Sequence, residues 1–333
     1  MASHVRLRLW GAWLVSLAIT VGLFAYLLAD VDVGDLAALA GQAGPAPLLA
    51  FAALMAASIV IRALRFWILL GRAVPLSLLA GITMVRNLFV DLLPARMGEL
   101  SYVYLVTSRT GRPVEEALAT LVLAFLLDVI ALAPLLVLAV LVIGGALAAP
   151  AEVLVAASAA IAVIGYVALR LAAPVSVMAA GVLEHRAPGR LARLAPRLRL
   201  LAGTLADARE QGRLLPALVL SLLLRACKYG SVYCLMLAVL TPLGYTAERL
   251  GFFPVFLAAV SAEVAAALPL HGLGGFGTYE TAWTLTFSQL GFPREHAVAS
   301  GILGHLFGQV AEYVVGGLAL AWIMRPRASG AAR

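Results

Sequence analysis

The stretch LPLHGLGGFGTYE, residues 268–280, interrupts a membrane-length apolar segment, which stops at Pro269 and resumes after several glycines. A shorter stretch of the same kind, LPARMGE at residues 93–99, interrupts an earlier apolar segment. Proline and glycine are the residues that break helices. Each stretch therefore predicts a helix that is broken within the membrane.

The likeness between the two stretches continues downstream. The residues Gly, Pro, Glu, Ala and Ala of GRPVEEALA (residues 111–119) recur 180 positions later in GFPREHAVA (residues 291–299). Interrupted hydrophobic segments in two similar halves are typical of transporters built from inverted repeats. We therefore expect one transmembrane domain, residues 1–333, which contains repeat 1 (about residues 48–147), a cytoplasmic basic amphipathic segment (172–213) and repeat 2 (about 214–324).

The composition predicts an all-α polytopic membrane protein. Of 333 residues, 63% are hydrophobic and 12% are charged, and the mean hydropathy is +1.01, far from the composition of soluble domains. The net charge of +7 comes from arginines between apolar segments, so we expect no nucleic-acid partner. Cys227 and Cys234 are too few for a disulfide framework or a metal cage, and we expect neither a metal nor a cofactor.

The apolar segments predict about six full spans and two re-entrant hairpins. The hairpins are expected at residues 77–106 and 251–290. Arg62, Arg65 and Arg72 at the end of the second span are interpreted as cytoplasmic charges, and the same rule places both termini in the cytoplasm of a bacterial inner membrane. The hairpins then enter from opposite leaflets. The expected spans are Trp10–Ala29, Leu48–Leu70, Ala117–Gly144, Val153–Leu171, Leu214–Leu240 and Ala297–Met324.

The motifs resemble a known family. LPARMGE with the following G-x-P-x-E, the intramembrane Asp128, and LP shortly before GGFGTYE are similar to the flippase-like transmembrane family that includes the membrane half of lysylphosphatidylglycerol synthases. The similarity extends from about Arg62 to Ala321. It implies a lipid flippase whose partners are membrane lipids. We expect the substrate to be an anionic phospholipid, and a separate lipid-synthesising enzyme is a possible partner.

Ionisable residues inside the apolar segments are the candidate site. A charged side chain at the bilayer centre costs on the order of 3 kcal/mol, so it must pair or face water. For Glu263 and Glu312, a structural ion pair and a functional role are equally compatible with the sequence. We predict that Arg96 and the amides around Gly275 and Gly277 hold a lipid phosphate, while Glu99 and Glu280 gate or orient it. The candidate substrate-binding residues are Arg86, Asp91, Arg96, Glu99, Asp128, Arg225, Lys228, His271, Gly274, Gly275, Gly277 and Glu280.

Several of these features have a second interpretation. The glycine-rich break either exposes helix N-terminal amides to a phosphate or only permits tight hairpin packing. His271 and His305 are either hydrogen-bonded core residues or proton carriers. The arginines of the basic segment either follow the positive-inside rule or contact anionic lipid.

An enzyme of lipid or lipid-linked sugar metabolism, a glycosyl- or headgroup-transferase, is the alternative function. Such enzymes need acidic or histidine groups on water-facing loops, and no H-E-x-x-H pattern occurs in the chain. The buried ionisable groups also argue against a passive scaffold. We therefore expect a transporter and not an enzyme.

Overall fold

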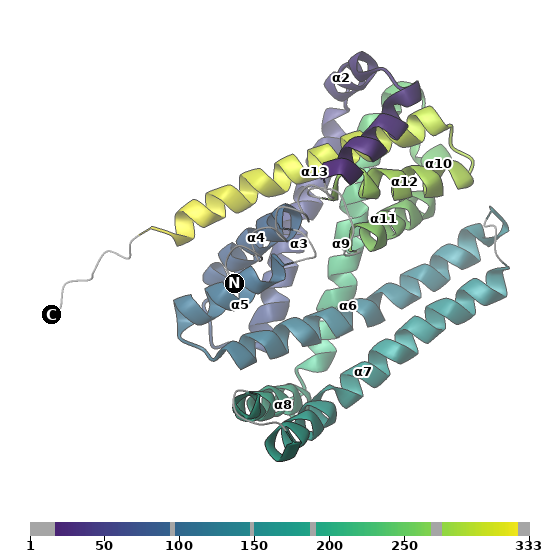
Figure 1. The fold of residues 1–333 in the computed structure, drawn as a ribbon. Helices are drawn as coiled ribbons and strands as arrows, with labels where there is room; N and C mark the ends of the chain where they lie inside the picture. Colours follow the sequence, from purple (N-terminus) through teal and green to yellow (C-terminus); the bar gives the residue numbers. More distant parts are fainter. Residues whose placement is uncertain (1–16, 94–96, 147–149, 187–190, 268–274, 326–333) are drawn as a thin grey trace.

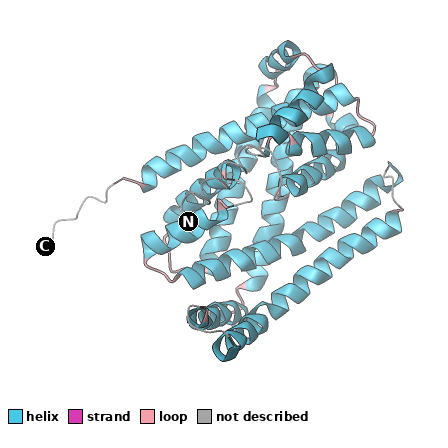
Figure 2. Ribbon diagram, viewed as in Figure 1, coloured by secondary structure: helices cyan, strands magenta, loops and turns pink. Residues whose placement is uncertain are grey.

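The computed structural model describes residues 17–93, 97–146, 150–186, 191–267 and 275–325, and every regular element in these ranges is a helix (Figures 1 and 2). Five of the described helices are long and apolar enough to span a membrane. The predicted class, an all-α polytopic membrane protein, is therefore confirmed. The five helices are α3 (Pro45–Leu69), α6 (Val114–Ile143), α7 (Ala151–Arg186), α9 (Leu214–Leu240) and α13 (Arg294–Ile323).

The predicted first span, Trp10–Ala29, is described only in part. Its second half forms the apolar helix Leu17–Leu27, and residues 1–16 lie outside the described ranges. The remaining short elements connect the spans. They are η1 (Leu28–Asp30), α2 (Val33–Gly41), η3 (Gly144–Ala146), η4 (Ala192–Leu194), η5 (Thr241–Leu243) and α10 (Ala247–Leu250).

Both predicted interruptions separate pairs of short helices. The first lies between α4 (Leu76–Leu92) and α5 (Glu99–Thr110), and the second between α11 (Phe252–Ala266) and α12 (Thr278–Gln289); the two helices of each pair pack together. A helix of 12 residues, such as α5 or α12, is about 18 Å long and cannot cross a hydrocarbon core of about 30 Å. Each pair is therefore a hairpin beside the full spans.

The two halves of the chain repeat the same elements in opposite directions. The helices after the hairpins, α6 and α13, each have 30 residues, and each begins directly after a proline, Pro113 or Pro293. In Figure 1 α6 runs from left to right and α13 from right to left. The helices before the hairpins, α3 and α9, pack along each other. The arrangement is an inverted repeat.

Gly98 permits the close approach of α5 to α4. A Cβ atom at this position would lie 2.1 Å from the carbonyl carbon and oxygen of Phe89 in α4. The backbone of α4 cannot yield to a side chain, so the glycine of LPARMGE is a requirement of the hairpin. The residues between the two helices, 94–96, lie outside the described ranges.

The helix α7 is longer than the predicted span Val153–Leu171. It continues through Pro174 to Arg186 and packs on α6 and on α8 (Ala195–Glu210). Arg170 suggested a span end, but the residues that follow it are again mostly apolar. The first part of the predicted basic segment, residues 172–186, therefore belongs to α7. The rest includes α8, which buries the face that carries Ala202 and Leu205.

Small residues bring the two repeats together where α4 crosses α13. A Cβ atom on Gly316 of α13 would lie 2.6 Å from the Leu88 Cβ and 3.0 Å from the Met84 carbonyl oxygen, both in α4. A Cβ atom on Gly81 of α4 would lie 2.7 Å from the ring of Trp322. Close contact through glycine is a common way for membrane helices to associate without a hydrophobic driving force.

We therefore expect Gly316→Ala to destabilise the protein and Gly317→Ala to be tolerated. The methyl group at position 316 has no space, and overpacking of this kind costs about 1–3 kcal/mol. A Cβ atom at position 317 would meet nothing within 4 Å. Thermal unfolding of the two purified variants in detergent measures the difference. Equal melting temperatures would contradict the described α4–α13 contact.

Candidate functional site: a charged cavity between the repeats

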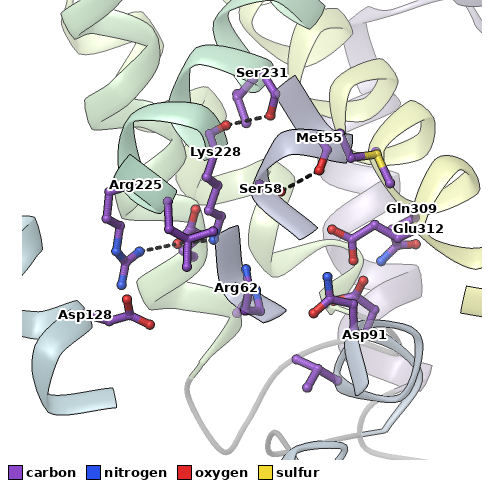
Figure 3. A pocket seen from close by; sticks show the side chains of 18 of the residues that line it. Met55, Ser58, Arg62, Asp91, Asp128, Arg225, Lys228, Ser231, Gln309 and Glu312 are labelled. Atoms are coloured by element: carbon purple, nitrogen blue, oxygen red, sulfur yellow. Dashed lines mark hydrogen bonds and ion pairs between the residues drawn. The ribbon is translucent and has the colours of Figure 1, made fainter. Parts of the chain in front are cut away.

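A cavity of about 580 Å³ lies between the two repeats, and its wall includes residues of both hairpins (Figure 3). Leucine, phenylalanine and glycine form parts of the wall, but most of the intramembrane ionisable residues also face it. The acidic and basic side chains along the wall, apart from His305, are Arg62, Arg65, Arg86, Asp91, Glu99, Asp128, Arg225, Lys228, Glu263 and Glu312.

One ion pair ties α3 to α6. Arg65, which is 1% exposed, forms a salt bridge with Asp128 and donates a hydrogen bond of 2.8 Å to the hydroxyl of Ser221 in α9. The guanidinium thus connects helices of both repeats. Removing one member of such a pair would leave a buried charge without compensation, so we interpret this pair as part of the framework.

A second ion pair closes the first hairpin. Arg86 of α4 donates from Nε to a carboxylate oxygen of Glu99 at 2.6 Å and binds the other oxygen through Nη2. This forked geometry is the strongest arrangement of a guanidinium with a carboxylate. Arg86 also donates to the side-chain oxygen of Asn87 at 3.0 Å. Glu99 is the first residue of α5, where a negative charge also complements the helix dipole.

In repeat 2, one carboxylate is shared by two cations of α9. Glu263 of α11 lies 2.9 Å from the Lys228 ammonium and 3.8 Å from the Arg225 guanidinium. Arg225 also donates to the hydroxyl of Tyr229 at 3.1 Å. This contact anchors α11 near the second break to the long helix α9.

The second hairpin is held by a carboxylate and a histidine. Glu280, which is fully buried, accepts a hydrogen bond of 2.7 Å from the Gly277 amide, and its other oxygen lies 2.6 Å from Nδ1 of His305 in α13. The second ring nitrogen of His305 lies 2.8 Å from the amide nitrogen of Gln309. The Gly277 amide, one of the donors predicted for a phosphate, is thus occupied by Glu280.

The glycine that precedes α12 has a conformation that only glycine adopts readily. Gly277 has φ +88°, and a Cβ atom there would also lie 2.9 Å from the side chain of Leu23. The break therefore needs glycine for its backbone geometry and for packing. This finding supports the packing interpretation of the glycine-rich stretch at this position.

The carboxyl groups of Asp91 and Glu312 interact across the boundary between the repeats. Asp91 lies near the end of α4, and Glu312 lies in the second half of α13. Their side chains interact directly, on the opposite side of Arg62 from Asp128 and Arg225 in Figure 3. The two carboxyl groups make one part of the wall acidic.

The structure brings together most of the predicted site residues. The cavity is lined by Gly275 and by the charged residues Arg86, Asp91, Glu99, Asp128, Arg225 and Lys228. Glu280 contacts His305, which is itself part of the cavity wall. Gly277 lies at the start of α12, where its amide contacts Glu280. Arg96, His271 and Gly274 fall outside the described residues.

Sequence reasoning missed two cations of the wall, Arg62 and Arg65, which it interpreted only as cytoplasmic charges. Both line the cavity. A signal for them exists, because SIVIRALRF at residues 58–66 resembles SLLLRACKY at residues 221–229. In this second internal similarity Arg62 corresponds to Arg225 and Arg65 to Lys228. The two segments belong to α3 and α9, the helices that pack together between the repeats.

Comparison with known proteins supports the same relationship over most of the chain. The family model described as the lysylphosphatidylglycerol synthase TM region matches residues 13–316. No curated protein sequence matches the chain. The matched range includes both hairpins and all the ionisable side chains of the cavity wall named above.

We expect Glu99→Gln to lower stability by about 3 kcal/mol or more, because it leaves the Arg86 charge buried without a carboxylate. The double variant Arg86→Met, Glu99→Leu should recover much of this loss, since it removes both charges. Thermal unfolding of the single and double variants measures the coupling. Additive losses in the double variant would show that the two side chains do not stabilise each other.

Proposed function

Because the chain belongs to the family of lysylphosphatidylglycerol synthase transmembrane regions, we propose that it is a lipid flippase of the bacterial inner membrane. It moves a phosphate-bearing lipid between the leaflets and does not alter it chemically. The observation that carries this proposal is the charged cavity between two inverted repeats. In transporters of this kind the substrate binds at the repeat interface and is exposed to each side in turn.

The cavity wall favours a lipid over a soluble anion. Val122 and Phe125 of α6 line the cavity, and they are 38% and 58% exposed. Large apolar side chains that are left uncovered on a membrane span suit contact with acyl chains. A lipid can therefore place its polar head group among the charges while its tails remain in the membrane. We propose an anionic phospholipid as the substrate, supplied in the membrane by a separate lipid-synthesising enzyme.

One observation favours the alternative function, a membrane enzyme: Glu280 and His305 form a carboxylate–histidine pair. A carboxylate that orients a histidine is a common arrangement for a general base. Here, however, both ring nitrogens of His305 have protein partners, Glu280 at 2.6 Å and Gln309 at 2.8 Å. Neither nitrogen is free to take a proton from a substrate, so the pair supports a structural role better.

We expect the purified protein in liposomes to move a fluorescent phosphatidylglycerol between leaflets without changing its mass. Dithionite quenching of the label measures its distribution, and mass spectrometry of the extracted lipid measures its identity. Empty liposomes and liposomes that contain an unrelated membrane protein are the controls. A lipid of altered mass with an unchanged leaflet distribution would favour the enzyme.

The flippase proposal also requires hairpins that open toward opposite leaflets. We expect a cysteine at Gly111 to react from the cytoplasmic side and a cysteine at Gly291 from the outside. Both positions follow the second helix of a hairpin, α5 or α12. An impermeant thiol reagent, applied to intact cells and to inside-out membrane vesicles after Cys227 and Cys234 have been replaced, makes this test. Reaction of both positions from one side would contradict the proposed orientation.

A further inference from the structure

Arg62 is a cation of the cavity wall that has no protein partner among the described residues. No described carboxylate lies within 4.0 Å of its guanidinium, and its buried Nε atom has no hydrogen-bond partner. Arg86 and Arg65 repel its charge more strongly than Asp128 and Glu312 attract it. In Figure 3 it lies between the Asp128–Arg225 side and the Asp91–Glu312 side of the cavity.

The other described cations of the wall are engaged. Arg65 binds Asp128 and Arg86 binds Glu99. Arg225 and Lys228 share Glu263. A half-buried charge without a carboxylate partner is still costly at membrane depth, and a protein that keeps such a charge gives up stability at that position. Sites of this kind are characteristic of function.

The internal similarity between the α3 and α9 segments shows why Arg62 has no carboxylate partner whereas the other cations of the wall do. Arg62 in α3 corresponds to Arg225 in α9, and Arg65 corresponds to Lys228. In the α9 copy, Glu263 from the neighbouring hairpin neutralises both cations. In the α3 copy, Asp128 neutralises Arg65 alone. In α9, therefore, a carboxylate neutralises both cations of the segment, whereas in α3 the guanidinium of Arg62 has no carboxylate partner at the cavity wall.

We propose that Arg62 is the residue that binds an oxyanion in this cavity, and that the oxyanion is the phosphate of a lipid head group. This inference rests on the proposed flippase function and assigns its phosphate-binding residue. The planar guanidinium offers several N–H donors to phosphate oxygens, and paired bonds of this type are short and strong. The ligand supplies the negative charge that Glu263 supplies at the equivalent position in α9.

The stability of two variants distinguishes a binding residue from a structural one. Arg62→Gln should leave the melting temperature of the ligand-free protein unchanged or raise it, because no protein partner is lost. Arg65→Gln should lower the melting temperature, because Asp128 then loses its partner. Arg170→Gln, which removes an exposed charge from α7, controls for the change in net charge. An Arg62→Gln variant as unstable as Arg65→Gln would overturn the proposal.

Ligand binding is measured by the thermal shift that three probes produce in detergent. Phosphatidylglycerol should raise the melting temperature of the wild type and of Arg170→Gln, as any ligand of the folded state does. Arg62→Gln should weaken this binding by about tenfold or more, the loss expected for a charged hydrogen bond. Diacylglycerol with the same acyl chains lacks the phosphate and should produce no shift in either protein.

The thermal shift produced by inorganic phosphate, the third probe, shows whether the bound oxyanion comes from a lipid or from free phosphate. If it produces a shift that Arg62→Gln abolishes and phosphatidylglycerol produces none, Arg62 stands as the oxyanion site and free phosphate, not a lipid, is its ligand. If phosphatidylglycerol stabilises Arg62→Gln and the wild type equally, the proposal is wrong. The result is separable from the flippase test, because binding through Arg62 without movement of lipid in liposomes would refute the flippase and leave the site.

Discussion

The bilayer offers no hydrogen-bond partners to a broken helix, and this constraint governs the arrangement of the whole chain. Irregular backbone at membrane depth is tolerated only against protein or water. The described residues that flank the two breaks meet this requirement, because Leu93, Glu99 and Gly275 line a common cavity. Glu280 then satisfies the exposed amide at Gly277, and Gly98 allows α5 to start against the backbone of α4.

The same constraint explains why the charges of the interior are organised as pairs between helices. Each hairpin has a glutamate in the first turn of its second helix, and each glutamate reaches a different partner, Arg86 in one repeat and His305 in the other. The repeats are therefore alike in backbone and unlike in chemistry. One hairpin is closed by an ion pair within itself, and the other depends on α13.

Much of the fold follows from the sequence because its signals are local. Proline and glycine mark the breaks, and the bounds of α9 coincide with the predicted span Leu214–Leu240. The end of α7 differs from the predicted one because a single charge, Arg170, does not end a helix when the residues after it are again mostly apolar. Arg62 and Arg65 were assigned to the cytoplasm by a rule about charge near span ends. Their place in the cavity wall depends on how α3 packs against α6 and α9, which no local pattern contains.

The single helix α7 has a consequence for how such a protein can arise from a smaller one. Each repeat contains two spanning helices, α3 and α6 or α9 and α13, so a repeat begins and ends on the same side of the membrane. Two copies joined directly would therefore insert in the same orientation. One additional crossing reverses the second copy, and α7 provides it between α6 and α9. A duplicated ancestral gene would thus have needed an odd number of linking spans to bring its two halves face to face, and a deletion of α7 would restore a tandem, parallel arrangement without a shared interior.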